Sequence, residues 1–327
     1  MKQYLSKVFE QQTLSKEEAK EALLQIGSGN VNPSQIAAFL TSYIIRPITV
    51  DELEGFRAAM LDLAINIDLS AFNALDVCGT GGDGKDTFNI STTAALVVAG
   101  AGQNVAKHGN HGVSSPVGSS TVLEYLGVKF TNDESFLQKK IEQAGICYLH
   151  APLFHPAMKY VAPIRKELGF KTFFNLLGPL LNPARVQMQY TGVYSMEVFD
   201  LYTRLFRRGR GDFAVVHALD GYDEISLTGE FKLETREMIM HLFPHSLGYP
   251  TIKQEELHGG NTVEEAAKIM LNVLNDKATD AQKNAVIANA AIALHIGKKI
   301  SVQDAQLLAQ ESIESGKALK SFKKLIE

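Results

Sequence analysis

Short apolar segments typical of strands alternate with helical patterns along most of this chain, and no other feature constrains the fold as strongly. Each helix between two strands provides the crossover that parallel strands need, so the alternation favours a mainly parallel sheet covered by helices on both faces. The segments predicted to be strands are residues 74–78, 104–106, 146–149, 190–194 and 213–217, followed by 225–227 and 237–243. We therefore expect a large α/β domain over residues 71–327.

The first 70 residues carry helical patterns without a convincing strand. Capping boxes begin at Ser15 and Thr49, each before apolar residues at helical spacing. Pro33 marks the start of another helix, because proline is favoured at the first helical position. We expect a small helical domain over residues 1–70, joined by a segment near residues 165–187.

The composition is that of a globular protein. The 327 residues are 45% hydrophobic and 21% charged, and the net charge of -4 gives no general attraction for nucleic acid or an anionic membrane. Two cysteines, Cys78 and Cys147, suit a reducing compartment. The N-terminus has no apolar signal segment, and the most apolar stretch, residues 94–102, is too short to span a bilayer. We expect a cytoplasmic protein that binds neither nucleic acid nor membrane.

A cluster of glycines follows the first predicted strand of the α/β domain. Gly79, Gly81, Gly82 and Gly84 surround Asp83, and glycines let backbone N–H groups approach a ligand closely. The cluster matches neither the Walker pattern nor the dinucleotide-binding pattern. Taken alone, it favours a phosphate-binding loop and a tight strand-to-helix turn about equally.

A polar stretch, Asn89, Ile90, Ser91 and Thr92, begins the next predicted helix. A hydroxyl at a helix start is usually only a cap, but the same geometry directs free N–H groups and the positive end of the helix dipole at an anion. A serine hydroxyl there can also bind Mg²⁺. Because this stretch lies one loop away from the glycine cluster, we favour phosphate binding.

Polar residues also follow the next predicted strand. Lys107 provides a cation and Asn110 an amide, and Ser114, Ser115 and Ser119 come after them. Ligands of open α/β sheets bind outside the carboxyl ends of the strands, where these residues are expected to lie. We therefore favour a second anion-binding stretch over a polar loop without a ligand.

Two adjacent carboxylates, Asp223 and Glu224, come shortly after the strand predicted at residues 213–217. Such a pair is often a solvated turn, but Mg²⁺ prefers one or two carboxylates together with substrate phosphates and water. With phosphate-binding loops elsewhere, these two residues are the best metal candidates, and Asp83 is the next.

Other charged or polar side chains are expected to have structural roles. Judged on its neighbours alone, Arg165 is solvated or paired with an acid such as Glu167, rather than bound to a substrate carboxylate. His150 and His155 are also expected to be structural. Two basic clusters are expected to be solvated helix faces, namely Arg204, Arg207, Arg208 and Arg210, and Lys317, Lys320, Lys323 and Lys324.

Together these stretches resemble the anthranilate phosphoribosyltransferase family of tryptophan biosynthesis, over nearly the whole chain. The glycine loop alone is shared with nucleoside phosphorylases of similar fold, whereas the full set is specific. His111 and Lys171 stand where the family more often has other residues. The matching segments are residues 76–84, 87–92, 107–110, 161–169, 174–183 and 223–224.

The resemblance implies a small helical domain beside a large α/β domain, with the site between them, and a homodimer. It implies transfer of a phosphoribosyl group from phosphoribosyl pyrophosphate to the amine of anthranilate, with Mg²⁺ as cofactor. The metal is implied to bind Ser91, Asp223 and Glu224. Anthranilate, which carries a carboxylate, is implied to contact Gly79, Asn110 and Arg165, which reverses the interpretation of Arg165 given above.

The resemblance also implies which residues bind the phosphoribosyl donor and which take part in catalysis. The donor-binding residues are Gly79, Gly82, Asp83, Thr87, Asn89, Ile90, Ser91, Thr92, Lys107, His108, Gly109, Asn110, Ser114, Ser115 and Ser119. The catalytic residues are Lys107, His108, Asn110 and Arg165.

Three alternative functions remain open at this stage. A nucleoside phosphorylase would share the glycine loop, but Arg165 and residues 175–183 argue against it. A catalytically silent relative that binds nucleic acid would have a basic surface and no acidic pair, unlike this chain. A phosphoribosyltransferase for a different aromatic acceptor is the third, and the sequence does not exclude it.

Overall fold

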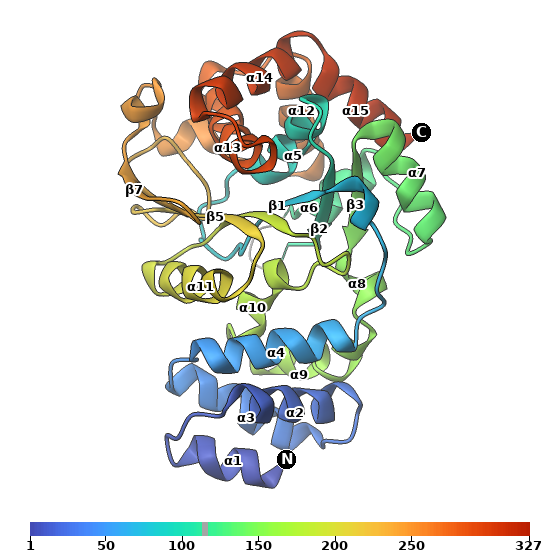
Figure 1. Cartoon of the computed structure of the whole chain (residues 1–327), viewed down its shortest axis with the longest axis vertical. Helices are drawn as coiled ribbons and strands as arrows, with labels where there is room; N and C mark the ends of the chain where they lie inside the picture. Colours follow the sequence, from blue (N-terminus) through green and yellow to red (C-terminus); the bar gives the residue numbers. More distant parts are fainter. Residues whose placement is uncertain (113–116) are drawn as a thin grey trace. The chain divides into compact units, whose positions relative to one another are not determined.

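A computed structural model describes residues 1–112 and 117–327 (Figure 1). The chain forms two compact units, each of which draws on more than one stretch of sequence. The first unit comprises Met1–Ile67 and Ala151–Pro183, and the second comprises Asp68–His150 and Ala184–Glu327.

The first unit is helical, as the capping signals predict. Both capping boxes are confirmed. The side chains of Ser15 and Thr49 each accept the backbone N–H of the third helical residue, whose glutamate side chain accepts the backbone N–H of the cap residue. The α-helices are α1 (Lys2–Phe9), α2 (Lys16–Gly27), α3 (Pro33–Ile45), α4 (Val50–Asp62), α8 (Ala151–Phe154), α9 (Ala162–Leu168) and α10 (Phe174–Leu177). Two short 3₁₀ helices span Pro156–Tyr160 and Gly178–Leu180.

Aromatic rings from both stretches of sequence fill the centre of the first unit. Phe56 of α4 stacks on Phe173 with ring centroids 4.4 Å apart, and Phe39 and Tyr43 of α3 meet both rings edge to face. These four side chains are buried. The helical unit therefore has a core to which residues 151–183 contribute.

A buried ion pair lies beside this aromatic core. Glu52 is fully buried and accepts hydrogen bonds from Arg46, from the Tyr43 hydroxyl and from the backbone N–H of Leu14. Arg46 also lies over the Tyr43 ring, with its guanidinium carbon 4.8 Å from the centroid. The charge of Glu52 is thus compensated inside the bundle.

The second unit is built on a seven-stranded sheet with the order β3-β2-β1-β4-β5-β6-β7. The first five strands run parallel and the last two are antiparallel. The strands are β1 (Leu75–Gly79), β2 (Val105–Gly109), β3 (Ile146–His150), β4 (Met188–Gly192), β5 (Asp212–Ala218), β6 (Phe231–Thr235) and β7 (Ile239–Leu242). The mainly parallel sheet predicted from the alternation of elements is confirmed.

One predicted strand is wrong and one observed strand was not predicted. Residues 225–227 form no strand, because Leu227 has a left-handed φ of 61° and the Ile225 N–H bonds a side chain instead of a neighbouring strand. The strand that follows β5 is β6, formed by Phe231–Thr235. The predicted strand at residues 237–243 is observed as β7.

Helices cover both faces of this sheet. In Figure 1, α5 and α13 lie on one face, whereas α11 lies on the opposite face. The α-helices of the second unit are α5 (Ile90–Gly100), α6 (Ser119–Tyr125), α7 (Glu134–Ala144), α11 (Met196–Arg208), α12 (Val263–Leu274), α13 (Asp280–Lys298), α14 (Val302–Glu314) and α15 (Lys317–Ile326). Short 3₁₀ helices span Ser70–Phe72, Pro244–Leu247 and Gln254–Leu257.

The order of the strands reverses between β1 and β4. From β1 the chain proceeds through α5 to β2 on one side, and from β4 it proceeds through α11 to β5 on the other. Right-handed crossovers in opposite directions place the two helices on opposite faces. The carboxyl ends of β1 and β4 therefore form the topological switch point, where open α/β sheets bind ligands.

Across the part of the chain that the structure describes, no single helix is long and apolar enough to cross a membrane. The helices α13 and α14 meet those two criteria only as a pair, and they are bent by 117° at the break between them.

Candidate active site

The switch point is formed by two strand ends that pair with each other. Gly79, the last residue of β1, lies opposite Gly192, the last residue of β4. The N–H of Thr80 continues this ladder by donating to the Gly192 carbonyl oxygen at 3.0 Å. The glycine loop thus leaves the sheet at the position where a ligand is expected.

The loop after β1 has the backbone that its glycines predict. Gly81, Gly82 and Gly84 have φ values of 63°, 78° and 70°, in the left-handed region that disfavours other residues. The N–H of Gly81 donates to Asp223 Oδ2 at 2.6 Å. The glycine loop and the acidic pair, which are far apart in sequence, are therefore in direct contact.

The acidic pair also packs against both strand ends. A Cβ at Gly79 would lie 2.4 Å from Asp223 Oδ2, and a Cβ at Gly192 would lie 1.5 Å from the carbonyl oxygen of Asp223. A side chain at Gly192 would collide with backbone, whereas a side chain at Gly79 would have to displace the Asp223 carboxylate. Gly192 was not predicted as a site residue, although a glycine at the end of a predicted strand was a usable signal.

Glu224 bonds the start of the next helix. Its Oε1 accepts the backbone N–H of Ser91 at 3.0 Å, and its Oε2 accepts the Thr87 hydroxyl at 3.4 Å. The N-cap residue Asn89 makes no side-chain capping bond and instead donates to the Val117 carbonyl oxygen at 3.2 Å. Glu224 therefore accepts a free N–H group in the first turn of α5 that an N-cap side chain would normally accept.

Both acidic side chains are buried, with exposed fractions of 8% for Asp223 and 7% for Glu224. Burial raises the pKa of Asp223, and the nearby Asp83 raises it further. Burial and the charge of Asp223 raise the pKa of Glu224 well above its ordinary value. Asp83 Oδ2 is itself buried, with no hydrogen-bond partner among the residues that the structure describes. Three carboxylates thus lie close enough for Asp83 to raise the pKa of both Asp223 and Glu224, and a divalent cation would offset their charge.

Over residues 1–112 and 117–327, no group of three or more His, Cys, Asp or Glu side chains has the geometry of a complete metal site. Mg²⁺ does not need such a group, because it commonly binds one or two carboxylates and takes its other ligands from substrate phosphates and water. The donor set of Asp223 and Glu224 is therefore compatible with Mg²⁺ and not with a closed structural site.

Lys107 of β2 is buried against the neighbouring strand β1. Its Nζ donates to the Val77 carbonyl oxygen at 2.5 Å, and its side chain is buried. Burial lowers the pKa of Lys107, while the negative charges of Asp76, Glu224 and Asp223 oppose that shift. The ammonium group of Lys107 therefore lies against β1, and its charge favours the ionised form of Glu224.

The stretch after β2 is held by its own hydrogen bonds. The His108 N–H donates to Asp76 Oδ1 at 3.2 Å, and the His108 side chain is buried. Asn110 accepts the Ser119 hydroxyl on its carbonyl oxygen at 3.1 Å and the His111 N–H on Oδ1 at 2.8 Å. A Cβ at Gly109 would lie 2.3 Å from the Tyr148 hydroxyl oxygen. The predicted residues Ser114 and Ser115 lie outside the described residues.

Arg165 belongs to the helical unit and lies on α9. Its Nη2 donates to Asn175 Oδ1 at 3.2 Å, and its guanidinium carbon lies 5.3 Å from the centroid of Phe174. Burial lowers the pKa of Arg165. No ion pair joins Arg165 to Glu167 or to any other residue of the described ranges. A half-buried guanidinium without a carboxylate partner suits an anionic group from outside the chain.

The side chains expected to be structural make contacts within the protein. His150 bonds the Ser120 hydroxyl at 2.8 Å, and His155 bonds the Leu181 carbonyl oxygen at 3.0 Å. Arg207 pairs with Glu234 at 2.6 Å, and Lys317 pairs with Glu311 at 2.6 Å.

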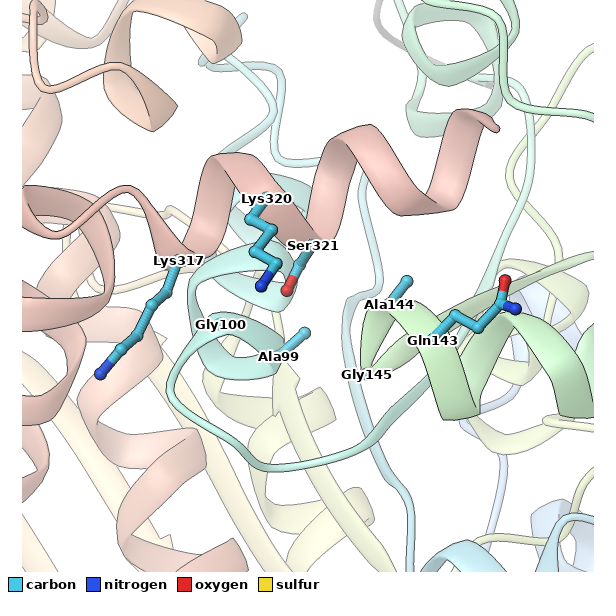
Figure 2. Close-up of a pocket in the computed structure, with 8 residues that line it drawn as sticks. All are labelled: Ala99, Gly100, Gln143, Ala144, Gly145, Lys317, Lys320 and Ser321. Carbon is cyan, nitrogen blue, oxygen red and sulfur yellow. The ribbon is translucent and has the colours of Figure 1, made fainter.

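A pocket elsewhere on the second unit lies apart from this site. Figure 2 shows that it is lined by the C-terminal ends of α5 and α7 and by α15, with the side chains of Lys317 and Lys320 at its edge. Gly100 lies in this pocket, whereas Ser91 at the other end of the same helix contacts Glu224. A rise of 1.5 Å per residue separates the two ends by about 14 Å. The pocket is therefore not part of the candidate site.

Comparison with known proteins defines the class. Residues 71–319 match the a/b domain of a glycosyl transferase family, and residues 2–64 match the helical bundle domain of a glycosyl transferase family. The fold and the site thus define a glycosyl transferase with a small N-terminal helical domain and a large α/β domain, which confirms the predicted fold class.

Similar proteins identify the family within this class. An anthranilate phosphoribosyltransferase of Flavobacterium johnsoniae is 56% identical, over 100% of this chain and 99% of that protein. The chain belongs to the anthranilate phosphoribosyltransferase family.

Solved structures support the same assignment. Anthranilate phosphoribosyltransferase from Thermus thermophilus superposes with a TM-score of 0.92 at 35% identity, over 98% of each chain. The enzyme from Saccharomyces cerevisiae in complex with PRPP and Mg superposes with a TM-score of 0.91 at 29% identity, over 99% of this chain and 96% of that chain. The yeast enzyme has also been solved in complex with 4-fluoroanthranilate.

Proposed function

We propose that this chain transfers the 5-phosphoribosyl group from phosphoribosyl pyrophosphate to the amine of anthranilate, giving N-(5-phosphoribosyl)anthranilate and pyrophosphate, in tryptophan biosynthesis. Membership of the family supports the reaction. The observation that carries the site is the contact of Asp223 and Glu224 with the two phosphate-compatible loops, at Gly81 and Ser91.

The donor would lie across the loops at the switch point. The N–H groups of Gly81 and Ser91 already donate to Asp223 and Glu224, so the phosphoribosyl donor would meet these loops beside the acidic pair, where a glycine-rich backbone and a helix start suit phosphate oxygens. The stretch from Lys107 to Asn110, with Ser119, would line the second side. Ser114 and Ser115 remain predicted members of the same set.

Ser91, Asp223 and Glu224 are the residues that would hold Mg²⁺. When bound, Mg²⁺ supplies positive charge that neutralises the leaving pyrophosphate. The carboxylates are buried and contact both loops, so the ion and the phosphates would meet at the same place. Lys107 would stabilise the ionised acidic pair through its charge.

The acceptor would be oriented by Arg165, Asn110 and Gly79. Anthranilate carries a carboxylate, for which a guanidinium is the natural bidentate partner. The amine then attacks C1 of the ribose as the bond to pyrophosphate breaks, through a state with oxocarbenium character. An aromatic amine attacking such a carbon needs alignment more than a strong base. His108 is the side chain that we propose for proton handling.

Three further features belong to this proposal. The helical domain would span residues 1–70 with a segment near residues 165–187 joined to it. The protein would act as a homodimer, and it would be cytoplasmic, as expected of an enzyme that uses small soluble substrates.

The reaction can be tested directly. Purified protein is mixed with anthranilate, phosphoribosyl pyrophosphate and Mg²⁺, and the loss of anthranilate fluorescence is followed with each component omitted in turn. We expect a loss that requires all three components. A folded protein that binds phosphoribosyl pyrophosphate but leaves anthranilate unchanged would redirect the search to another aromatic acceptor.

A further inference from the structure

A buried side chain on another element bonds the backbone of the segment that carries the acidic pair. Asn289 of α13 donates from Nδ2 to the carbonyl oxygen of Ile225 at 2.9 Å, and its Oδ1 accepts the Ile225 N–H at 3.0 Å. Ile225 directly follows Glu224. One amide side chain therefore binds both polar backbone groups of the residue next to the acidic pair, as a neighbouring strand would.

The hydrogen-bonding capacity of Asn289 is fully used. Its second Nδ2 hydrogen is donated to the carbonyl oxygen of Ala285 at 2.7 Å, and its Oδ1 also accepts the hydroxyl of Tyr190 on β4. An asparagine amide offers two donors and two acceptor positions, and all four have partners here. Asn289 is fully buried, and Tyr190 is 1% exposed. Such a network fixes the amide in one orientation, because any flip would leave buried groups unpaired.

This anchor holds a segment that lacks regular structure. Residues 220–230 contain no helix or strand. The hydrogen bonds of Asn289 therefore replace the backbone bonds that a neighbouring strand would make with this segment. They also link the segment to β4 through Tyr190 and to α13, on which Asn289 lies. The carboxylates of Asp223 and Glu224 are thereby held at Gly81 and Ser91.

We infer that Asn289 and Tyr190 are positioning residues for the magnesium site, acting through the backbone of Ile225. The inference rests on the proposed function, since it assumes that Asp223 and Glu224 hold Mg²⁺. Both side chains are buried and bond protein groups, so their role in the site is indirect. Their role is to keep the two carboxylates at fixed places before Mg²⁺ and the donor bind, which lowers the cost of ordering the site.

Two variants and one matched control test this inference. Tyr190→Phe removes only the hydroxyl, and Asn289→Asp replaces the donors to two carbonyl oxygens with an acceptor. Ser312→Ala is the control, because the Ser312 hydroxyl makes one buried hydrogen bond, to Val97 at 2.8 Å on α5, away from the acidic pair. We measure the Mg²⁺ concentration for half-maximal activity, the melting temperature, and amide hydrogen exchange of the peptide covering residues 220–228 in the metal-free protein.

We expect Tyr190→Phe and Asn289→Asp to raise the half-maximal Mg²⁺ concentration about tenfold, as supporting partners of metal ligands typically do. Exchange in residues 220–228 should become faster in the same variants. Ser312→Ala should lower the melting temperature without changing either measurement. If Asn289→Asp does not fold, Tyr190→Phe alone decides the result.

Two results would overturn the inference, and they differ from each other. If Tyr190→Phe folds and keeps wild-type Mg²⁺ dependence and wild-type exchange, the anchor has no positioning role, although the metal site stands. If replacing Asp223 and Glu224 themselves leaves the Mg²⁺ dependence unchanged, the metal assignment fails and this inference fails with it.

Discussion

Glu224 Oε1 accepts the backbone N–H of Ser91 at 3.0 Å, so a carboxylate occupies the first turn of a helix whose start is also suited to phosphate. Asp223 Oδ2 accepts the backbone N–H of Gly81 in the glycine loop at 2.6 Å. The two carboxylates thereby shape both loops before any ligand arrives. They also make the loops dependent on the acidic pair, which leads to the first prediction.

The paired substitution Asp223→Asn with Glu224→Gln should reduce kcat/KM by about 100-fold or more, since charge stabilisation by a metal is worth several kcal/mol. The remaining activity should no longer respond to Mg²⁺. The assay is the loss of anthranilate fluorescence over a Mg²⁺ titration. Asp220→Asn is the control, because Asp220 precedes the same turn but is exposed and bonds Thr228. Unchanged Mg²⁺ stimulation in the paired variant would refute the assignment.

Gly79→Ala should inactivate the protein without unfolding it. The new methyl group would lie 2.4 Å from Asp223 Oδ2 and must displace that carboxylate. A displacement of about 1 Å in a catalytic group can cost about 100-fold in rate. Gly209→Ala is the matched control, because the nearest atom to its Cβ lies at 3.5 Å. Steady-state kinetics and circular dichroism are compared for the two variants, and near-normal activity in Gly79→Ala would contradict the close approach.

Arg165→Ala should raise the KM for anthranilate by about 10- to 100-fold, the value of a lost hydrogen bond to a charged group. The KM for phosphoribosyl pyrophosphate should change little. Lys166→Ala removes the neighbouring cation, which is exposed, and serves as the control. A variant in which both KM values stay at the wild-type level would exclude the carboxylate contact.

The metal-free protein should lose stability as pH rises through the range in which Asp223 titrates. Burial raises the pKa of Asp223 to about 7, whereas an aspartate in an unfolded chain has a pKa of about 4. Between these values the folded protein holds more protons than the unfolded chain, so the free energy of unfolding falls with increasing pH.

Urea unfolding of wild type and Asp223→Asn across this pH range checks the prediction. The variant has no titrating group at this position, so wild type should lose stability relative to it as pH rises. Mg²⁺ with the phosphoribosyl donor should reduce the loss. A gain of wild type relative to the variant would show that the sign is wrong.

Arg46→Met should destabilise the helical unit by about 3–5 kcal/mol, because it leaves the fully buried Glu52 without its cation. Lys16→Met removes an ion pair of similar length, 2.6 Å to Glu54, that is partly exposed. That control should cost less than about 1 kcal/mol. Thermal unfolding distinguishes the two, and equal effects would mean that burial of the pair is unimportant.

The sequence predicted the elements well where local signals are strong. Capping boxes located α2 and α4, and glycine after β1 located the loop, because these patterns act over a few residues. Residues 225–227 were predicted as a strand, as part of a stretch interpreted as rich in strands. The structure instead gives Leu227 a left-handed φ and bonds Ile225 to Asn289, and neither feature leaves a local signal.

Contacts across long sequence separations could not be read from the chain. Asp223 meets Gly81 across 142 positions, and Glu224 meets Ser91 across 133. The orientation of the Lys107 side chain could not be predicted either. Its strand is buried on both faces, so the sequence shows no alternation of polar and apolar residues that assigns side chains to one face or the other. The site residues themselves stay predictions until the variants above are measured.

The stacking of Phe56 on Phe173 has a consequence during synthesis of the protein. Residues 1–67 leave the ribosome before the strands β1, β2 and β3, and Phe173 follows only after them. At typical translation speeds, the aromatic face of α4 stays uncovered for roughly 5 to 20 s. The helical unit is therefore the first part to be translated, but it cannot complete its core until three of the seven strands have emerged. Its folding depends on prior synthesis of residues 68–150, which belong to the other unit.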